Sequence, residues 1–411
     1  SQSGHSNRKG YCGSRKNGPS GSLPNAIINV TNRCNLRCEH CAVYMESDGR
    51  VSSHTAVASR AVALDRVNAP LSDSHDYPFH EITQLIDKLA ARGVRNLVLF
   101  GGEPLLRRDL ADIICYAASR VPNLGLATNG TLFKPEITST VAAHVKDVRI
   151  SLDGSCPEVH DRIRGPKAFV RTMEGIRMLR RTGFRNIYIK AVITRKNVGD
   201  IPNLVKLASH LEVKLELNVF LPLGRGCVTK EELHVDTEQL IRAFKCVWLL
   251  AEFYGLDSAS FNAACNKWIG RASDNCGAGD GCVLVDCSGD VYPCEALQYA
   301  PLRMGNLVTD KFVQIAPLTD TFDRRVDSVP NCSTCEVRYF CSGGCAAEAY
   351  LSGGETSVSA LCDFYRTILP LIASRWDPGL SSWRNLKRVF PGELDFSLVR
   401  DYLPASTGVH A

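Results

Sequence analysis

The 411-residue sequence lacks any run of 18 or more apolar residues, and its N-terminus lacks the apolar stretch of a secretory signal peptide. These two absences predict a protein of the reducing cytoplasm with no membrane partner. Residues 1–38 contain no Asp or Glu, yet the net charge of the whole chain is only +5. So mild an excess of positive charge does not favour nucleic acid as a partner.

Cysteine, in contrast, is abundant, with 18 residues in the chain. Secreted proteins with this many cysteines usually pair them in disulfides, but such proteins are usually short. Here the cysteines cluster at tight spacings in a long chain, which favours metal or iron–sulfur ligation. Cys115 and Cys246 stand apart from these clusters on predicted helices, so we expect them to lie in the core.

The middle of the chain alternates apolar, β-branched runs with helical stripes, which predicts parallel βα units. The predicted strands are 26–31, 94–100, 123–128, 147–153, 186–193 and 213–219. The intervening predicted helices are 81–93, 107–120, 135–144, 168–182 and 200–211. The fold class is therefore α/β. A partial (β/α)6 TIM-like barrel fits better than a doubly wound sheet, although spacing alone leaves the second arrangement open.

Changes in amino-acid composition and apolar periodicity along the chain predict five segments. They are a disordered basic tail (1–23), the barrel (24–235), a linking helix region (236–270), a small Cys-rich domain (271–365) and a C-terminal tail (366–411). One further helix is expected over 363–375. The insertion at 42–80 is either a lid over the active site or a surface decoration.

Three cysteines follow the first predicted strand directly. Cys34, Cys38 and Cys41 form a C-x3-C-x2-C pattern in a loop where parallel α/β folds gather ligand chemistry. Three soft thiolates suit an iron–sulfur cubane that keeps one iron open to an external ligand. A structural zinc would need a fourth protein ligand, and His40 is too close to Cys41 in sequence to supply it easily.

This pattern, with "GGEP" (101–104) after the second strand, resembles the radical SAM superfamily. The resemblance implies that S-adenosylmethionine (SAM) occupies the open iron. It also implies that Gly101 and Gly102 let the backbone approach the methionine moiety, while Glu103 accepts a hydrogen bond from its ammonium group.

Four further positions correspond to SAM-binding residues of that family. Asn129 in "ATNG" and Ser151 in "SLDG" end strands three and four, where the family contacts the SAM ribose and carboxylate. Arg164 is a candidate partner for the carboxylate, and its alternative is a solvated surface arginine. His40 stands where the family usually has an aromatic residue next to the adenine.

The C-terminal cysteines resemble the SPASM extension of radical SAM enzymes, with all seven of its characteristic positions present. The resemblance implies two auxiliary clusters and hence three [4Fe-4S] clusters in total. The first would use Cys276, Cys282, Cys294 and Cys345, with Cys287 as a rival for the place of Cys282. The second would use Cys332, Cys335, Cys341 and Cys362. A pair of zinc knuckles is the alternative.

The resemblance implies reductive cleavage of SAM to a 5'-deoxyadenosyl radical, with electrons from a flavodoxin- or ferredoxin-type donor. The radical would take a hydrogen atom from a peptide or protein, for a crosslink, an epimerisation or an oxidation. Glu295, directly after Cys294, would be the catalytic base, or else a surface carboxylate. Only about 25 residues precede the first strand, with no sign of a fused leader-peptide-binding domain.

Two other functions remain open. The first is an epimerase or dehydrogenase that acts on a sugar, an aminoglycoside or another small natural-product intermediate. The second is an electron-transfer or cluster-scaffold protein, against which the complete SAM motifs argue.

Overall fold

The computed structural model describes residues 23–42, 76–256, 273–309 except 280, 324–353, 357–390 except 376, 378 and 381, and residues 399 and 402. Six parallel strands form its centre, and their order in the sheet follows their order in the sequence. They are β1 (Asn25–Asn29), β2 (Asn96–Phe100), β3 (Asn123–Thr128), β4 (Asp147–Ser151), β5 (Ile187–Ile193) and β6 (Lys214–Val219). The predicted α/β class with parallel βα units is confirmed.

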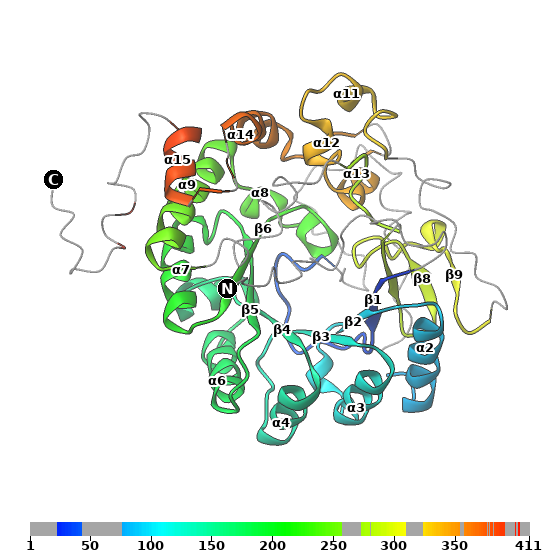
Figure 1. Cartoon of the computed structure of the whole chain (residues 1–411). Helices are drawn as coiled ribbons and strands as arrows, with labels where there is room; N and C mark the ends of the chain where they lie inside the picture. The colour runs from blue at the N-terminus through cyan, green and yellow to red at the C-terminus, as the bar shows by residue number, and fades with distance from the viewer. Residues whose placement is uncertain are drawn as a thin grey trace.

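Helices cover the outer side of this curved sheet (Figure 1). They are α2 (Phe79–Ala91), α3 (Leu110–Arg120), α4 (Pro135–His144), α6 (Ala168–Arg181), α7 (Ile201–His210) and α9 (Thr237–Phe253). Shorter helical segments fill the loops: η1 (Pro104–Leu106), α5 (Pro157–Arg164), η2 (Val198–Asp200), η3 (Gly224–Cys227) and α8 (Lys230–Leu233). Every helix predicted between the strands is present, whereas α5 was not anticipated.

The alternation of side chains along a strand explains the layering. In β5, Ile187, Ile189, Ala191 and Ile193 are fully buried in the core under the helices, and the residues between them are half-buried. These intervening side chains point to the other face of the sheet, the inner wall of the barrel. Burial of the helix-facing rows supplies the main favourable free energy of folding for this region.

A ladder of asparagine side chains ties the starts of the first three strands together. Asn123 Nδ2 donates to Asn96 Oδ1, and Asn96 Nδ2 donates to Asn25 Oδ1, both at 2.8 Å. Asn25 Nδ2 in turn donates to the carbonyl of Gly281 at 2.7 Å. Because a shift of one residue would move every side chain to the other face, this ladder helps to fix the strand register.

The sheet continues past β1 into the Cys-rich region. Strand β7 (Cys282–Val285) pairs in parallel with β1, and β8 (Asp290–Tyr292) and β9 (Gly305–Asn306) follow it as antiparallel strands. The nine-stranded order is β6-β5-β4-β3-β2-β1-β7-β8-β9. One continuous sheet therefore joins the predicted barrel to the predicted cluster-binding region.

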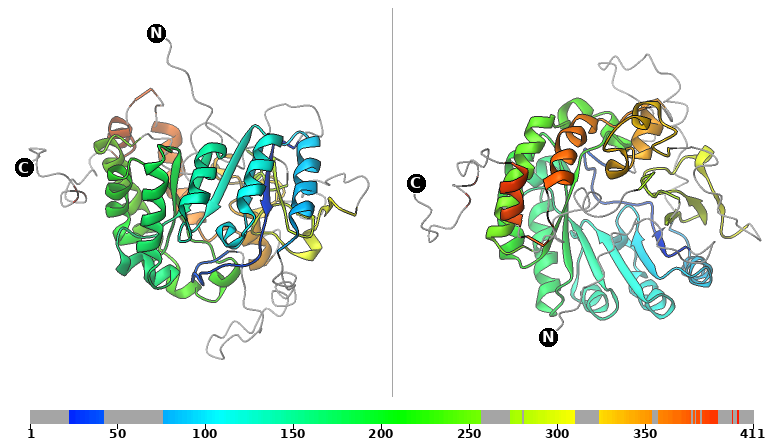
Figure 2. Two further views of the ribbon diagram at one scale, coloured as in Figure 1. Left: turned by 90° about the horizontal axis from the view of Figure 1, so that it is seen from below. Right: turned by 45° about the horizontal axis from the view of Figure 1, so that its top comes forward.

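Short helices and one long helix complete the C-terminal part. They are η5 (Ala300–Leu302), α11 (Pro330–Ser333), α12 (Arg338–Cys341), α13 (Ala346–Ser352), α14 (Cys362–Arg375) and α15 (Ser382–Val389). Helices α9, α14 and α15 pack side by side (Figure 2). The rings of Phe244 and Phe364 stack at 5.3 Å between their centres. The helix predicted over 363–375 corresponds to α14.

Several predictions fall outside the described residues, namely the basic tail and most of the 42–80 insertion. In the part of the chain that the structure describes, no helix is long and apolar enough to cross a membrane. Cys246 is buried as predicted, but Cys115 is exposed on α3, so its predicted place in the core is wrong. Ile113 and Ile114 take the core side of that helix.

Gly175 gives a test of how tightly α6 packs. Replacement of a helical glycine by alanine usually stabilises a helix, yet a Cβ at Gly175 would lie 2.4 Å from the carbonyl oxygen of Gly130. We expect Gly175→Ala to cost about 1–3 kcal/mol by overpacking and to lower the melting temperature by several degrees. Gly199→Ala is the control, because nothing lies within 4 Å of its Cβ position. Equal melting temperatures for both variants would contradict this packing.

Candidate active site and cluster sites

The loop that carries Cys34, Cys38 and Cys41 is bonded to the GGEP loop after β2. The amide of Gly102 donates to Thr31 O, and the amide of Glu103 donates to Arg33 O, both at 2.8 Å. Gly101 adopts a φ of +153°. A Cβ there would lie 2.4 Å from Thr31 O. The backbone of the two motif loops therefore approaches too closely for any residue but glycine at this position.

The other side of the cysteine loop is held by the segment after β6. The amide of Arg225 donates to Cys41 O at 2.9 Å, and its guanidinium Nη1 donates to Cys38 O at 3.0 Å. Gly224, at φ +52°, again leaves no space for a side chain, since a Cβ would lie 2.5 Å from Cys41 O. Helix α5 also contacts the loop, since the carbonyl of Ile163 accepts a hydrogen bond from the amide of Glu39 at 3.0 Å.

The three thiols of this loop lie within electrostatic range of one another. Although Cys34 is exposed as a whole residue, desolvation by the surrounding protein raises the pKa of its thiol to about 11, and the nearby Glu103, Cys38 and Cys41 add to the rise. Burial likewise raises the pKa of Cys38, although the Arg164 guanidinium opposes the effect. The loop thus presents three soft sulfur donors, with a permanent cation beside Cys38 that favours the thiolate form of that residue.

Glu103 is fully buried between the ends of β2 and β3. Its Oε1 accepts from Thr128 Oγ1 at 2.5 Å and from the amide of Leu105 at 3.0 Å, and its Oε2 accepts from the amide of Asn129 at 2.6 Å. Burial raises its pKa to about 7 despite these hydrogen bonds. A cation that reached this carboxylate would be strongly favoured, because its charge would offset the cost of burial.

Asn129 connects the end of β3 to the cysteine loop. Its Nδ2 donates to Asn35 Oδ1 at 2.9 Å, and its Oδ1 accepts from the amide and the hydroxyl of Thr131. Thr131 Oγ1 accepts from Asn35 Nδ2 at 2.9 Å, which closes the network. Asn35 lies inside the cysteine motif, so this amide helps to fix the position of the loop. Ser151, the last residue of β4, is half-buried on the next strand.

Asp153 organises the remaining predicted residues. It is fully buried, and its Oδ2 binds Arg164 Nε at 2.5 Å and His40 Nε2 at 2.9 Å. Arg164 Nη1 in turn lies 3.7 Å from Cys38 Sγ. Burial would raise the pKa of Asp153, but Arg164 and His40 lower it far below its usual range. Arg164 is thus a buried residue, not a solvated surface arginine, and His40 is directed to Asp153.

Among the C-terminal cysteines, Cys276, Cys294 and Cys345 lie together. All three pack against a buried cluster that includes Leu223, which follows β6. Burial raises the pKa of Cys294, and the charges of Glu295, Cys345 and Cys276 raise it further. The carboxylate of Glu295 is therefore close to this thiol.

Strand register distinguishes Cys282 from Cys287. In the hairpin, Leu284 faces Tyr292 and Val285 faces Val291. Extending this register by two residues puts Cys282 directly opposite Cys294. The amide of Gly279 bonds to the carbonyls of both Cys282 and Pro293, which shows that the two strands stay close there.

Cys287 lies at the opposite end of the hairpin, in the turn that follows β7. Burial raises its pKa to about 12, and its charged neighbours are Asp286, Asp76 and Arg107. No cysteine is among these neighbours. The described hairpin thus brings Cys282, and not Cys287, to the Cys294 end.

Cys332, Cys335, Cys341 and Cys362 form the other C-terminal set. All four line one small cavity, together with Arg338 and Arg366. The pKa of Cys341 is raised by burial and then by the other three thiols. The structure thus places Cys276, Cys294 and Cys345 in one group and these four thiols in another. Across the described residues, no three His, Cys, Asp or Glu side chains lie close enough to hold a single metal ion.

Sequence reasoning missed Asn35 and Asp153 as site residues. Asp153 is the third residue of "SLDG", so its place after a predicted strand was visible. Its pairing with Arg164 and His40 depends on the path of α5, which was not predicted. Asn35 was hidden among the ordinary polar residues of a loop.

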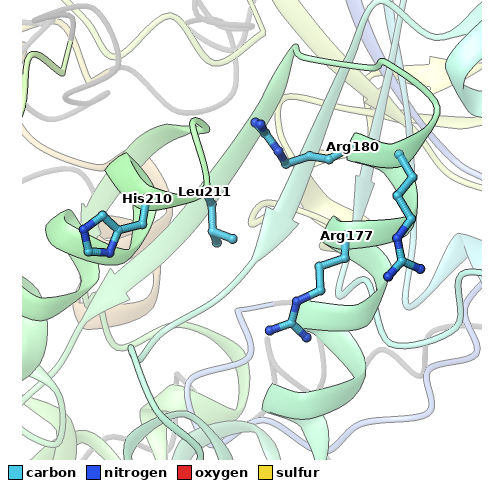
Figure 3. A pocket seen from close by; sticks show the side chains of 5 residues that line it. Arg177, Arg180, His210 and Leu211 are labelled. Carbon is cyan, nitrogen blue, oxygen red and sulfur yellow. The ribbon is translucent and has the colours of Figure 1, made fainter.

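A basic surface hollow of about 300 Å³ lies elsewhere on the molecule (Figure 3). It is lined by Arg177, Arg180 and Arg181 near the end of α6 and by His210 and Leu211 at the end of α7. These helix ends lead into the starts of β5 and β6, at the edge of the sheet opposite the cysteine loop. The hollow therefore plays no part in the site described above.

Comparison with known proteins agrees with this arrangement. A family model for the radical SAM superfamily matches residues 28–208, and one for the SPASM iron–sulfur cluster-binding domain matches residues 276–336. Mycofactocin maturase MftC of Mycobacterium ulcerans is 31% identical over 333 residues, covering 79% of this chain and 83% of the relative. The AdoMet-dependent heme synthase of Methanosarcina barkeri is 29% identical, covering 79% and 92%.

Solved structures show the same fold at lower identity. Native anSMEcpe with bound AdoMet superposes with a TM-score of 0.65 at 15% identity, over 85% of this chain and 98% of the other. Streptococcus suis SuiB bound to precursor peptide SuiA gives 0.64 at 15% identity, over 83% and 75%. The two family matches and the relative at 31% identity show that the chain belongs to the radical SAM superfamily and carries a C-terminal SPASM domain.

Proposed function

We propose that this radical SAM enzyme oxidatively modifies a peptide, by abstraction of a hydrogen atom at an unactivated carbon. The observation that carries the radical chemistry is the junction of the Cys34 loop with the GGEP loop and the buried Glu103. The peptide substrate is supported by a relative named for such a substrate, the PqqA peptide cyclase of Rhizobium meliloti, which is 27% identical over 353 residues.

In this proposal Cys34, Cys38 and Cys41 hold a [4Fe-4S] cluster, since three soft thiolates and no fourth donor leave one iron open. SAM bound there supplies the 5'-deoxyadenosyl radical on reduction. Gly101 and Gly102 have no side chains, so the backbone there can approach the methionine moiety of SAM. Asn129 and Ser151 contact the nucleoside and the carboxylate.

Glu103 and Arg164 supply opposite charges to the two ends of an amino acid group. The buried Glu103 carboxylate binds the ammonium, which would keep it ionised at neutral pH. Arg164, held by Asp153, has N–H groups left to meet a carboxylate and also favours the thiolate form of Cys38. His40, which is bound to Asp153, would lie next to the adenine of SAM.

The SPASM cysteines would hold two auxiliary [4Fe-4S] clusters. We assign Cys276, Cys282, Cys294 and Cys345 to the first and Cys332, Cys335, Cys341 and Cys362 to the second. Glu295, whose carboxylate lies near Cys294, would accept a proton from the substrate as its electron leaves. A flavodoxin- or ferredoxin-type protein of the cytoplasm would supply the reducing electrons.

A small molecule is the second candidate substrate. Three relatives are AdoMet-dependent heme synthases, and the one from Methanosarcina barkeri has nearly the same identity to this chain as the maturases. The names of these relatives point to a small biosynthetic intermediate, and not to a sugar, as the small-molecule substrate. The assay below separates the two candidates by which of them accelerates 5'-deoxyadenosine release.

The first test measures 5'-deoxyadenosine release by the anaerobically reconstituted protein with SAM and dithionite. Short peptides encoded beside the gene are added one at a time. We expect one peptide to accelerate release and to change in mass. Slow release that no peptide stimulates, with acceleration by a heme precursor or a sugar, would replace the peptide by a small molecule.

Cys34→Ala tests the assignment of the SAM cluster. The variant should lose SAM cleavage and about one third of its iron, because Cys34 is a ligand of only one of the three proposed clusters. Both auxiliary clusters should remain. Iron content and electron paramagnetic resonance of the reduced protein report the clusters. Cys115→Ala, at an exposed thiol on α3, is the control and should keep both iron and activity. Continued 5'-deoxyadenosine formation by Cys34→Ala would refute the assignment.

Cys282→Ala and Cys287→Ala form a matched pair for the fourth ligand of the first auxiliary cluster. Both side chains are buried, at 0% and 2% exposure, so loss of either sulfur leaves a similar cavity. We expect Cys282→Ala to lose iron from one auxiliary cluster, since an exchangeable ligand must replace the thiolate. Cys287→Ala should keep all its iron. The reverse pattern would make Cys287 the ligand.

A further inference from the structure

The inner wall of the barrel carries a row of polar residues on β4, β5 and β6. Arg149 on β4 pairs with Glu216 on β6 at 3.2 Å, reaching across the intervening strand β5. Tyr188 on β5 lies under this pair, with the Arg149 guanidinium 4.8 Å from its ring centre. Lys214 Nζ lies at the same distance from that ring. These four side chains must share one face, the face turned away from the helices.

Strand periodicity adds three residues to that face. Lys190 is two residues after Tyr188, Asn218 is two after Glu216, and Ser151 is two after Arg149. In the register, Ser151 faces Lys190, and Lys190 faces Glu216. Ser151 is the last residue of β4, so Lys190 lies level with the edge of the sheet that carries the cysteine loop.

Hydrogen bonds and an ion pair connect this level to the SAM site. The amide of Val192, two residues after Lys190, donates to Asp153 Oδ1 at 2.8 Å. Asp153 binds Arg164, which reaches Cys38. The strand end that carries Lys190 is therefore bonded to the ion pair beside Cys38. Lys190 lies on β5, beyond the strands β1 to β4 whose ends carry the residues assigned to SAM.

The charges below Lys190 are already balanced. Arg149 pairs with both Asp147 and Glu216. Lys214 donates to Asn186 Oδ1 at 2.8 Å and to the Tyr188 hydroxyl at 3.2 Å. The two cations, Arg149 and Lys214, thus balance the two carboxylates of Asp147 and Glu216 only when all four groups are summed.

Lys190 itself has no hydrogen bond or ion pair with any residue that the structure describes, although it is half-buried. The neighbouring Asn218 offers another unused hydrogen-bond donor, because its buried Nδ2 has no acceptor among the described residues. A cation and an amide N–H without acceptors on one wall are suited to an anion with two oxygens.

We propose that Lys190 and Asn218 form a subsite for a carboxylate of the substrate on the inner wall of the barrel. The proposal deepens the proposed function and rests on it in one respect, namely that the barrel interior receives the substrate. Lys190 is a binding residue in this assignment. It fixes which carbon of the substrate faces the SAM site by holding the carboxylate at a constant place.

The test uses the reconstituted holoenzyme without reductant, so SAM is not cleaved. Acylation of Lys190 by acetic anhydride is followed by mass spectrometry, with Lys134 at the exposed start of α4 as the internal reference. Two matched pairs of probes are added, N-acetyl-trialanine with its carboxamide and succinate with succinamide. We expect an acid to slow the acylation of Lys190 about tenfold and its amide to have no effect.

The outcomes separate this subsite from the choice of substrate class. Protection by the tripeptide acid supports both proposals, whereas protection by succinate alone supports the subsite and counts against a peptide. Protection by neither acid overturns the subsite. None of these results requires SAM cleavage or a cognate peptide.

Two variants complete the design. Asn218→Asp should remove the effect of the acids, because its carboxylate would pair with Lys190 in place of the probe. SAM affinity, measured by equilibrium dialysis, should be unchanged in Lys190→Met relative to the surface control Lys134→Met. SAM binding about tenfold weaker in Lys190→Met alone would assign the lysine to SAM and overturn the proposal.

Discussion

The rest of the site depends on the backbone bonds that hold the cysteine loop between two other loops. On one side Gly102 and Glu103 donate to the start of the loop, and on the other Arg225 donates to Cys41 O. Three thiols on a free loop would lose considerable conformational entropy when they bind one cluster. Here the protein fold has already ordered them. The two glycines at the contacts are consequences of this closeness, since any Cβ would separate the loops.

A second constraint is the buried charge at Asp153. Its carboxylate is fully buried, so it is stable only because Arg164 and His40 bind it. Loss of Arg164 would leave the Asp153 carboxylate in the core without its permanent cation. The same ion cluster positions the guanidinium beside Cys38 and anchors β5 through the amide of Val192. The order of the cysteine loop and the shape of the inner wall are therefore coupled through one side chain.

The sequence alone predicted the six strands and the helices between them. Apolar periodicity decides the strands, because each helix-facing row is fully buried, as in β5. It could not predict the parallel pairing of β7 with β1, which joins residues more than 250 positions apart. The short run that forms β7 has no periodicity of its own, and its partner is decided by the free edge of β1.

Side-chain roles were predictable only where a motif carried them. Glu103 stood out because GGEP sits at a fixed place after a strand, while the partners of Arg164 depended on a short helix that propensity did not reveal. The choice between Cys282 and Cys287 needed the hairpin register, because both follow Cys276 at plausible spacings. Since β7 extends the barrel sheet, the register that sets Cys282 opposite Cys294 also fixes that end of the hairpin against β1. The position of the first auxiliary set relative to the barrel is thus a property of the sheet, and not of a flexible connection between two domains.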